Sequence, residues 1–135
     1  MAPTFNDGDI VLYLRPVNDY RAGDVVSLWV PSGDYYVKRV IAVGGDVVEL
    51  EDGAVLVNGV AAEDSFAFGS TLEETGAVIY PYRVREGSVF VLGDNREVSM
   101  DSRAFGEVGL RQIRGRIILQ IGKDGIHVIG RGSGT

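Results

Sequence analysis

Short apolar runs separated by turn residues make up most of this chain. The runs are rich in valine, isoleucine and tyrosine, and glycine–aspartate pairs recur between them, a pattern typical of β-strands joined by tight turns. Asp52-Gly53 and Asn58-Gly59 stand at two of these junctions and favour two-residue hairpin turns. We predict strands at residues 10–15, 25–30, 35–43, 46–51, 54–57, 89–92 and 115–121. The pattern therefore predicts an all-β fold of mostly antiparallel strands.

Three segments depart from this pattern. Residues 61–82 alternate weakly and indicate an irregular excursion between strands, and residues 108–113 fit one short helical turn. The C-terminal residues 130–135, with the sequence GRGSGT, have the composition of a flexible tail. We therefore expect a single domain over residues 1–129, with at most one short helix, followed by that tail.

Composition narrows the class of protein. The chain has 135 residues, of which 45% are hydrophobic and 24% charged, as expected for one globular domain with a real core. The formal charge of -6 gives no electrostatic reason to expect a nucleic-acid partner. No cysteine is present, which excludes disulfides and thiolate chemistry. No apolar run approaches the roughly 18 residues of a membrane-spanning helix, so we expect these residues to be soluble.

Several kinds of catalytic site are disfavoured by the residues available. The single histidine, His127, lies near the C-terminus among apolar residues, where a structural or exposed role is commoner than a place in a Ser-His-Asp site. No group of histidine, aspartate and glutamate has the spacing of a metal site. We therefore expect neither a metal nor an organic cofactor.

Lys38 is a candidate for chemistry because of its neighbours. Strand alternation places Tyr36, Lys38 and Val40 on one face and Val37 and Arg39 on the other. An ammonium group among apolar side chains loses hydration, its pKa falls, and the neutral amine can then accept a proton from a serine hydroxyl. The alternative is a lysine on a strand edge whose ammonium reaches water. The segment by itself favours that alternative.

The segment from Gly93 to Arg103 is the most polar stretch that directly follows an apolar strand. It reads Gly-Asp-Asn-Arg-Glu-Val-Ser-Met-Asp-Ser-Arg. Burying such a segment requires its groups to satisfy one another, as Asp101 and Arg103 can by forming an ion pair. An exposed polar loop is the alternative, but it does not account for two arginines and two aspartates interleaved with serines.

Four blocks, in the same order, give the chain a resemblance to type I signal peptidases. Met1-Ala2-Pro3-Thr4-Phe5 is similar to the family's Ser-Met-x-Pro-Thr-Leu block without its leading serine. Residues 21–26 resemble the Gly-Asp-Ile-Val-Val strand, and residues 36–46 resemble Tyr-Val-Lys-Arg-Val-Ile-Gly-Leu-Pro-Gly-Asp, with Ala42 and Gly44 replacing Gly and Pro. Residues 93–103 resemble Gly-Asp-Asn-Arg-x-x-Ser-x-Asp-Ser-Arg. The resemblance extends from residue 1 to about residue 121 and implies the coiled β-sheets of that family.

The resemblance also implies roles for individual residues. Lys38 matches the general base, and Ser99 matches the serine that orients this lysine. Asp101 and Arg103 match an ion pair behind the site. The remaining supporting positions are Arg39, Gly93, Asp94, Asn95 and Arg96, and the substrate-contacting positions are Met1, Pro3, Tyr35, Tyr36 and Val37.

The nucleophile is the main departure from the family pattern. The attacking serine of the family stands directly before the position of Met1, and none of the serines in these 135 residues matches its motif. The membrane-anchoring helix and the strand forming the second wall of the substrate groove also have no counterpart here. We therefore expect the 135 residues to have no peptidase activity on their own.

The function implied by the resemblance is removal of signal peptides from secreted preproteins by a Ser–Lys dyad. The full-length protein would be anchored in the plasma membrane, with its catalytic domain on the extracytoplasmic side and against the membrane surface. Two alternatives remain: a non-catalytic domain that binds peptides or assists envelope or pilus assembly, and a self-cleaving repressor-type Ser–Lys domain. Lys38 and Ser99 argue against the first, since peptide binding requires no base. The Gly93–Arg96 block favours the peptidase over the second.

Overall fold

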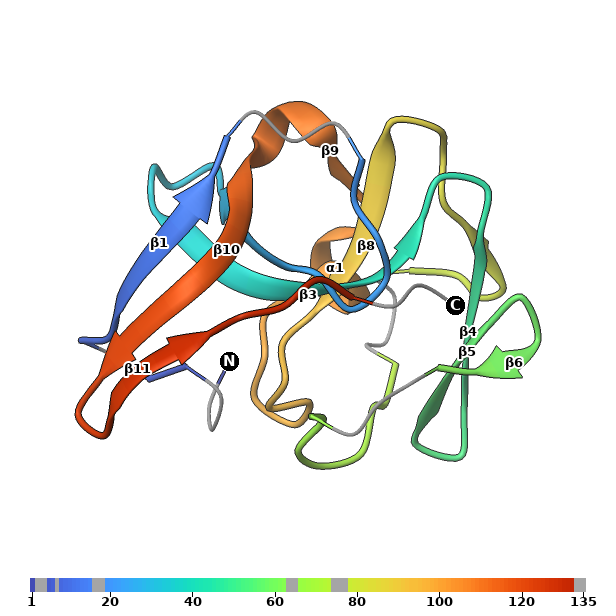
Figure 1. Cartoon of the computed structure of the whole chain (residues 1–135). Coiled ribbons are helices and arrows are strands. Elements are labelled where there is room, and N and C mark those ends of the chain that lie inside the picture. The colour runs from blue at the N-terminus through green and yellow to red at the C-terminus, as the bar shows by residue number, and fades with distance from the viewer. Residues whose placement is uncertain (2–4, 7, 16–18, 63–65, 74–77, 133–135) are drawn as a thin grey trace.

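The computed structural model describes residues 1, 5–6, 8–15, 19–62, 66–73 and 78–132, and these residues form two antiparallel sheets (Figure 1). The larger sheet has seven strands in the order β1-β10-β2-β3-β8-β9, with β11 paired to β10. The smaller sheet has four strands in the order β6-β5-β4-β7. The prediction of an all-β, mostly antiparallel fold is confirmed.

The larger sheet holds the longest strands of the chain. Its strands are β1 (Ile10–Leu14), β2 (Val25–Trp29), β3 (Tyr35–Val43), β8 (Ser88–Leu92), β9 (Val108–Gly109), β10 (Ile113–Gly122) and β11 (Gly125–Val128). The smaller sheet consists of β4 (Val47–Glu51), β5 (Ala54–Val57), β6 (Val60–Ala61) and β7 (Tyr82–Arg83). All seven predicted strands are present, within two residues at each end. The two-residue strands β6, β7 and β9 are too short to show alternation, and β11 was also not predicted.

The helical segments differ from the sequence-based expectation. Helix α1 spans Ser102–Phe105, within and just after the polar block, while a 3-10 turn at Leu110–Gln112 lies between β9 and β10. Asp101 accounts for the position of α1, because its side chain accepts a hydrogen bond from the Arg103 backbone N–H and so caps the helix N-terminus. The predicted helical turn is therefore present as the 3-10 helix, whereas the four-residue helix α1 was not predicted.

Both predicted hairpin turns are present. Asp52 and Gly53 have φ values of 52° and 79°, and Asn58 and Gly59 have values of 54° and 80°. Two consecutive left-handed residues are the signature of the type I′ turn, whose twist matches that of the strands it joins.

Strands β3 and β8 are covered by apolar side chains on both faces. On one face, Ile41 and Phe90 pack against Val48 and Val55 of the smaller sheet. On the other face, Val40 and its neighbours in β8 pack with residues of β2. A strand buried on both faces has a continuous apolar sequence, which explains the uninterrupted run in β8.

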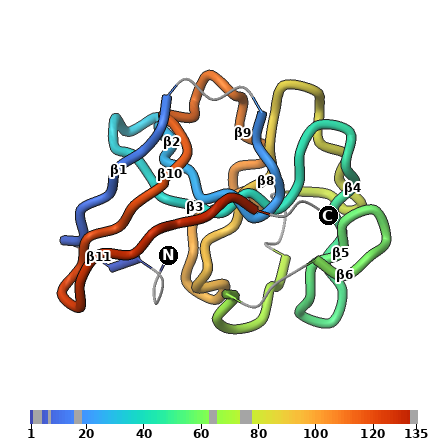
Figure 2. Tube along the Cα trace, viewed as in Figure 1, coloured from blue at the N-terminus to red at the C-terminus, as the bar shows by residue number. Residues whose placement is uncertain are grey.

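The chain returns to the centre of the molecule after the β10–β11 hairpin, as the red end of the tube in Figure 2 shows. The side chain of Ile129 packs with a third apolar cluster that includes Phe5, Val25 and Ile117. Residues 133–135 of the expected tail lie outside the described residues. Among the helices of the described part of the chain, none is long and apolar enough to cross a bilayer.

Candidate active site around Lys38

Lys38 lies in the middle of β3, and its side chain is buried. Its relative exposure is 7%, and its Nζ donates a hydrogen bond of 2.9 Å to Ser99 Oγ. Burial lowers the pKa of the Lys38 ammonium, Arg103 acts in the same direction, and the carboxylates of Asp101 and Asp94 oppose the change. The predicted contact between Lys38 and Ser99 is therefore present, in surroundings that favour a neutral amine.

Gly93 allows Ser99 to approach the lysine. A Cβ atom at this position would lie 2.1 Å from Ser99 Oγ and 3.4 Å from Lys38 Nζ. The first distance is far shorter than any contact between non-bonded atoms, so a side chain at residue 93 would displace Ser99. The glycine is needed here for space, not for an unusual backbone conformation.

Asp101 and Arg103 form the buried ion pair that the sequence predicted. Arg103 Nη2 lies 2.8 Å from Asp101 Oδ2, and both side chains are almost fully buried. Asp101 also accepts hydrogen bonds from the backbone N–H groups of Arg103 and Gly93. The pair therefore fixes both the start of α1 and the backbone beside Ser99.

A second buried ion pair lies on the opposite face of β3. Arg39 donates two hydrogen bonds to Asp94, of 2.9 and 2.8 Å, and a third to the Gly23 carbonyl oxygen. The Phe66 ring stacks on the guanidinium, with its centroid 3.7 Å from Arg39 Cζ. Alternation along β3 thus places Lys38 and Arg39 in two different polar environments.

The irregular segment that precedes β7 is hydrogen-bonded to the polar segment Gly93–Arg103. Arg96 Nη1 donates to Thr71 Oγ1 at 2.9 Å, and Arg96 Nε donates to the Gly93 carbonyl at 2.8 Å. Phe68 and Asn95 form an isolated β-bridge. Sequence reasoning missed this role of residues 66–73, because the partners are a threonine hydroxyl, a backbone carbonyl and a ring, none of which has a recognisable motif.

The first half of β3 offers an open edge beside Lys38. Residues Tyr35–Arg39 pair with β2, but β8 pairs with β3 only from Arg39 onward. Among the strands in the described parts of the chain, none occupies the other edge of residues 35–38. Tyr36 lies below the lysine, with Nζ 5.2 Å from its ring centroid.

A hollow of about 510 Å³ lies on the Val37 face of this edge. Val37 and Ser27, which are cross-strand partners, line it together with Tyr13, Tyr35 and Arg114. The Arg114 guanidinium lies against aromatic rings, 4.2 Å from the Tyr35 centroid and 4.9 Å from that of Tyr13. Sequence reasoning gave no role to Ser27 or Arg114.

Of the two N-terminal residues predicted to contact substrate, the structure describes only Met1. Met1 Sδ accepts a hydrogen bond of 3.3 Å from the Asp94 backbone N–H, which places the Met1 side chain against the polar segment Gly93–Arg103. Pro3 lies outside the described residues.

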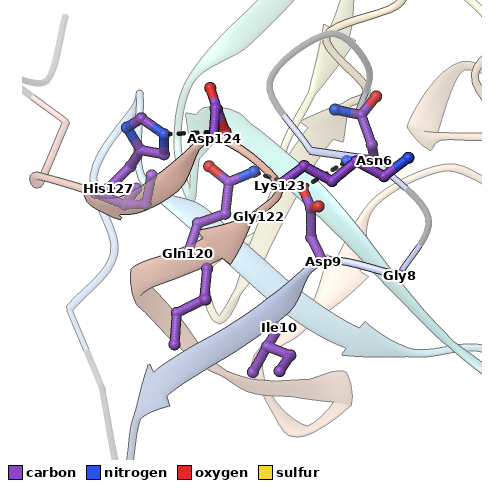
Figure 3. A pocket seen from close by; sticks show the side chains of 11 residues that line it. Asn6, Gly8, Asp9, Ile10, Gln120, Gly122, Lys123, Asp124 and His127 are labelled. Atoms are coloured by element: carbon purple, nitrogen blue, oxygen red, sulfur yellow. Dashed lines mark hydrogen bonds and ion pairs between the residues drawn. The ribbon is translucent and has the colours of Figure 1, made fainter.

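A larger hollow lies beside the β10–β11 hairpin (Figure 3). Its carboxylates already have partners: Gln120 Nε2 donates to Asp9 at 2.6 Å, and His127 lies 3.4 Å from Asp124. In the described parts of the chain, no three histidine, aspartate and glutamate side chains gather as a metal site would require.

Comparison with known proteins gives a consistent family. The sequence profile of "Signal peptidase, peptidase S26" matches residues 1–121. Signal peptidase I of Bacillus licheniformis is 33% identical over 129 residues, covering 85% of this chain and 68% of that protein. Thylakoidal processing peptidase 1 of Arabidopsis thaliana is 33% identical over 135 residues, covering 89% of this chain but only 38% of the plant protein. The chain thus spans less than half of the plant protein's length.

A solved structure gives the same result for the fold. The crystal structure of a signal peptidase I from Enterococcus faecalis V583 superposes with a TM-score of 0.62 at 30% sequence identity. The match covers 75% of this chain and 98% of the bacterial one.

Proposed function

The chain belongs to the signal peptidase family, peptidase S26, and from that premise we propose that it is the catalytic domain of a serine endopeptidase that removes signal peptides from secreted preproteins. One observation carries the proposal. Lys38 is a buried lysine with a lowered pKa, and its Nζ is held by Ser99 Oγ. A domain that only binds peptides has no use for such a group.

Lys38 acts as the general base in this proposal. Its neutral Nζ takes the proton of a serine hydroxyl on the residue directly preceding Met1, while that oxygen attacks the peptide carbonyl carbon. The protonated lysine then gives the proton to the leaving amine as the peptide C–N bond breaks. Water then hydrolyses the acyl-enzyme: Lys38 takes a proton from the attacking water and gives it to the serine oxygen as the acyl C–O bond breaks. This is a Ser–Lys variant of triad chemistry and requires no cofactor.

The position of Met1 supports this choice of nucleophile. The Met1 Sδ atom contacts the Asp94 backbone N–H, and a Cβ atom built on the neighbouring Gly93 would lie 3.4 Å from Lys38 Nζ. The Met1 side chain therefore lies near the residues around the base, in keeping with a nucleophilic serine directly before Met1. We therefore expect residues 1–135 alone, without that serine, to be inactive.

The open edge of β3 is the proposed binding site for the signal peptide. An extended peptide can add as a strand along residues 35–38, using its backbone groups for affinity. Alternate side chains of that peptide would project on the face of Val37 and Ser27, into the 510 Å³ hollow. Pairing would thus set the register of the scissile bond relative to Lys38.

An apolar sheet face is the proposed contact with the membrane surface. Ile10, Ile121 and Ile126 form one cross-strand row of β1, β10 and β11, and Leu12, Leu119 and Val128 form the next. The outer members of both rows, on β1 and β11, have exposures between 50% and 82%. Exposed apolar surface of this kind suits the boundary of a bilayer, and the full-length protein would be anchored in the plasma membrane with this domain on the extracytoplasmic side.

The test is peptidase activity in a form of the protein with serine directly before Met1. We expect cleavage of a preprotein at its signal-peptide junction, and we expect Lys38→Ala to lower kcat/KM on the order of 10⁴-fold. Lys123→Ala is the matched control, because Lys123 is the only other lysine of the chain. Cleavage by the 135 residues alone, or cleavage that survives Lys38→Ala, would rule out the proposed dyad.

A peptide-binding domain without catalysis is the second candidate, favoured by the open edge of β3 and its adjoining hollow. The two candidates differ in one measurement. If the serine-containing form binds a signal peptide but never cleaves it, the binding function stands and the peptidase is excluded.

A further inference from the structure

The segment after β11 crosses the molecule (Figure 1) and reaches the turn that precedes β2. The Ile129 backbone N–H donates to the Ile118 carbonyl at 2.9 Å, and the Ile129 side chain packs in the apolar cluster of Val25 and Ile117. Arg131 and Gly132 follow directly. This segment lies beyond residue 121, where the match to the family ends.

Asp24 is the anchor for the segment. Its carboxylate is fully buried at the start of β2 and accepts three hydrogen bonds: from the Arg21 backbone N–H at 2.9 Å, from Arg131 Nη2 at 2.9 Å and from the Gly132 backbone N–H at 2.7 Å. Two of the three donors therefore come from the C-terminal segment. A buried carboxylate that loses such donors is strongly destabilised.

Gly132 fits its position only because it has no side chain. A Cβ atom there would lie 2.0 Å from the Ala22 carbonyl oxygen and 2.6 Å from Gly23 Cα. At Gly130, by contrast, a Cβ atom would meet nothing within 4 Å. The segment therefore packs tightly against the turn before β2 at Gly132, whereas Gly130 has room for a side chain.

The turn that the segment holds is bonded to β3 next to Lys38. The Val40 N–H donates to the Asp24 carbonyl at 2.8 Å, and the Gly23 N–H donates to the Val40 carbonyl at 2.7 Å. The Gly23 carbonyl also accepts a hydrogen bond from Arg39 Nη1. Both residues that follow Lys38 in β3 are therefore fixed by the turn that Asp24 closes.

We propose that residues 129–132 form a C-terminal strap that holds β3 in place through Asp24, and that Arg131 and Gly132 are positioning residues for Lys38. The evidence for the strap is geometric and does not depend on the function of Lys38. The positioning role of Arg131 and Gly132 rests on the proposed function, in which Lys38 is the base. Loosening the strap should let β3 separate from the 21–24 turn and admit water to the lysine.

Amide hydrogen exchange tests the mechanical part of the proposal. In Gly132→Ala and Arg131→Ala, we expect exchange of the Val40 N–H to accelerate at least about tenfold more than that of the Val84 N–H, because local opening exposes only the first. Val84 is the reference because it is equally buried and its N–H is bonded to the Asp46 carbonyl in the other half of the molecule. Gly130→Ala is the matched control and should change neither amide.

Titration of the lysines tests the positioning part. The chain has only Lys38 and Lys123, so their side-chain NMR signals are readily told apart. We expect the Lys38 pKa to move upward in Gly132→Ala and Arg131→Ala, because water stabilises the ammonium form, while the Lys123 pKa stays unchanged. Arg131→Lys retains a cation for Asp24 and should restore most of the wild-type values.

Equal acceleration of the Val40 and Val84 amides would overturn the strap, since it would show only a global loss of stability. A differential effect on Val40 with an unchanged Lys38 pKa would overturn the positioning role. If Arg131→Ala fails to fold, Gly132→Ala supplies the same comparison. Neither readout requires peptidase activity, so survival of activity in Lys38→Ala would exclude the proposed base while leaving the strap in place.

Discussion

The polar corner around Lys38 and the inner face of the four-stranded sheet are buried to a similar degree but by opposite means. In the four-stranded sheet, valines such as Val48, Val55 and Val57 fill the space against β3 and β8. The corner instead buries charged side chains. They are Lys38, Arg39, Asp94, Arg96, Asp101 and Arg103.

The two regions therefore differ in what their burial achieves. Apolar burial stabilises at about 25 cal/mol per Å², whereas a buried ion pair often contributes no more than apolar residues of the same volume would. Each ion pair in the corner instead fixes the position of a backbone segment. Asp101 orients the backbone at Gly93, and Arg39 joins β3 to Asp94. The corner is thus organised for the orientation of Lys38, and the sheet beside it supplies the stability.

The largest expected effect comes from breaking one ion pair in the corner. We expect Asp101→Ala to lower the free energy of unfolding by about 3–5 kcal/mol, because the buried Arg103 guanidinium loses its carboxylate partner. Denaturant unfolding measures the change. Asp34→Ala, which removes an exposed carboxylate, is the control and should have little effect. A loss for Asp101→Ala as small as that of the control would show that the pair does not support the corner.

A cavity in the four-stranded sheet should have a smaller effect. We expect Val48→Ala to lower the free energy of unfolding by about 2 kcal/mol, because two methyl groups leave a fully buried site. The substitution should not alter the Lys38 pKa, which NMR titration would detect. A shift of that pKa would mean that the two regions are not independent, and would break the comparison.

Replacing the lysine itself should increase stability. Lys38→Met keeps an unbranched chain of similar length and removes the free-energy cost of burying an ionisable amine, so we expect a gain of about 1–2 kcal/mol near neutral pH. The gain should depend on pH. Because the folded-state pKa lies below the unfolded value of about 10.5, the unfolded state binds more protons between these two values, and wild-type stability rises with pH there.

The pH dependence gives the control for this substitution. Thermal unfolding of wild type and Lys38→Met should differ most below the folded-state pKa of Lys38 and converge as the pH approaches 10.5. A difference that is constant with pH would show that packing, not the ammonium, causes it.

The strands and the residues of the corner could be predicted from the sequence because their signals are local. The apolar runs gave the longer strands, Asp52-Gly53 gave its turn, and the block from Gly93 to Arg103 placed Ser99, Asp101 and Arg103 in one segment. The resemblance then paired Ser99 with Lys38, 61 residues away, which no local pattern could do.

The parts that could not be predicted depend on contacts distant in sequence. Arg131 meets Asp24 across 107 residues, and Thr71 meets Arg96 across the excursion. The GRGSGT composition indicates flexibility because glycine and serine favour it locally, whereas the bonds of Arg131 arise only once β11 has turned the chain back. Helix α1 was missed for a related reason, since four residues beginning after a capping aspartate show no apolar periodicity.

The smallest expected effect comes from removing a single hydroxyl group from either of two buried serines. Ser27 and Ser102 are both buried. Ser102 Oγ accepts a hydrogen bond of 2.9 Å from the Val91 N–H, whereas Ser27 Oγ has no hydrogen-bond partner within the described residues. Removing a buried hydroxyl that lacks a partner removes a desolvation penalty, while removing one that is bonded leaves the Val91 N–H unsatisfied.

We therefore expect Ser27→Ala to leave the free energy of unfolding unchanged or to raise it by up to about 1 kcal/mol, and Ser102→Ala to lower it by about 1–2 kcal/mol. Chemical denaturation of the two variants side by side provides the measurement. Ser27 lines the hollow on the Val37 face of the open edge, so a loss of stability in Ser27→Ala would indicate that its hydroxyl has a partner in solution. A peptide that enters the hollow would then have to replace that partner of the Ser27 hydroxyl.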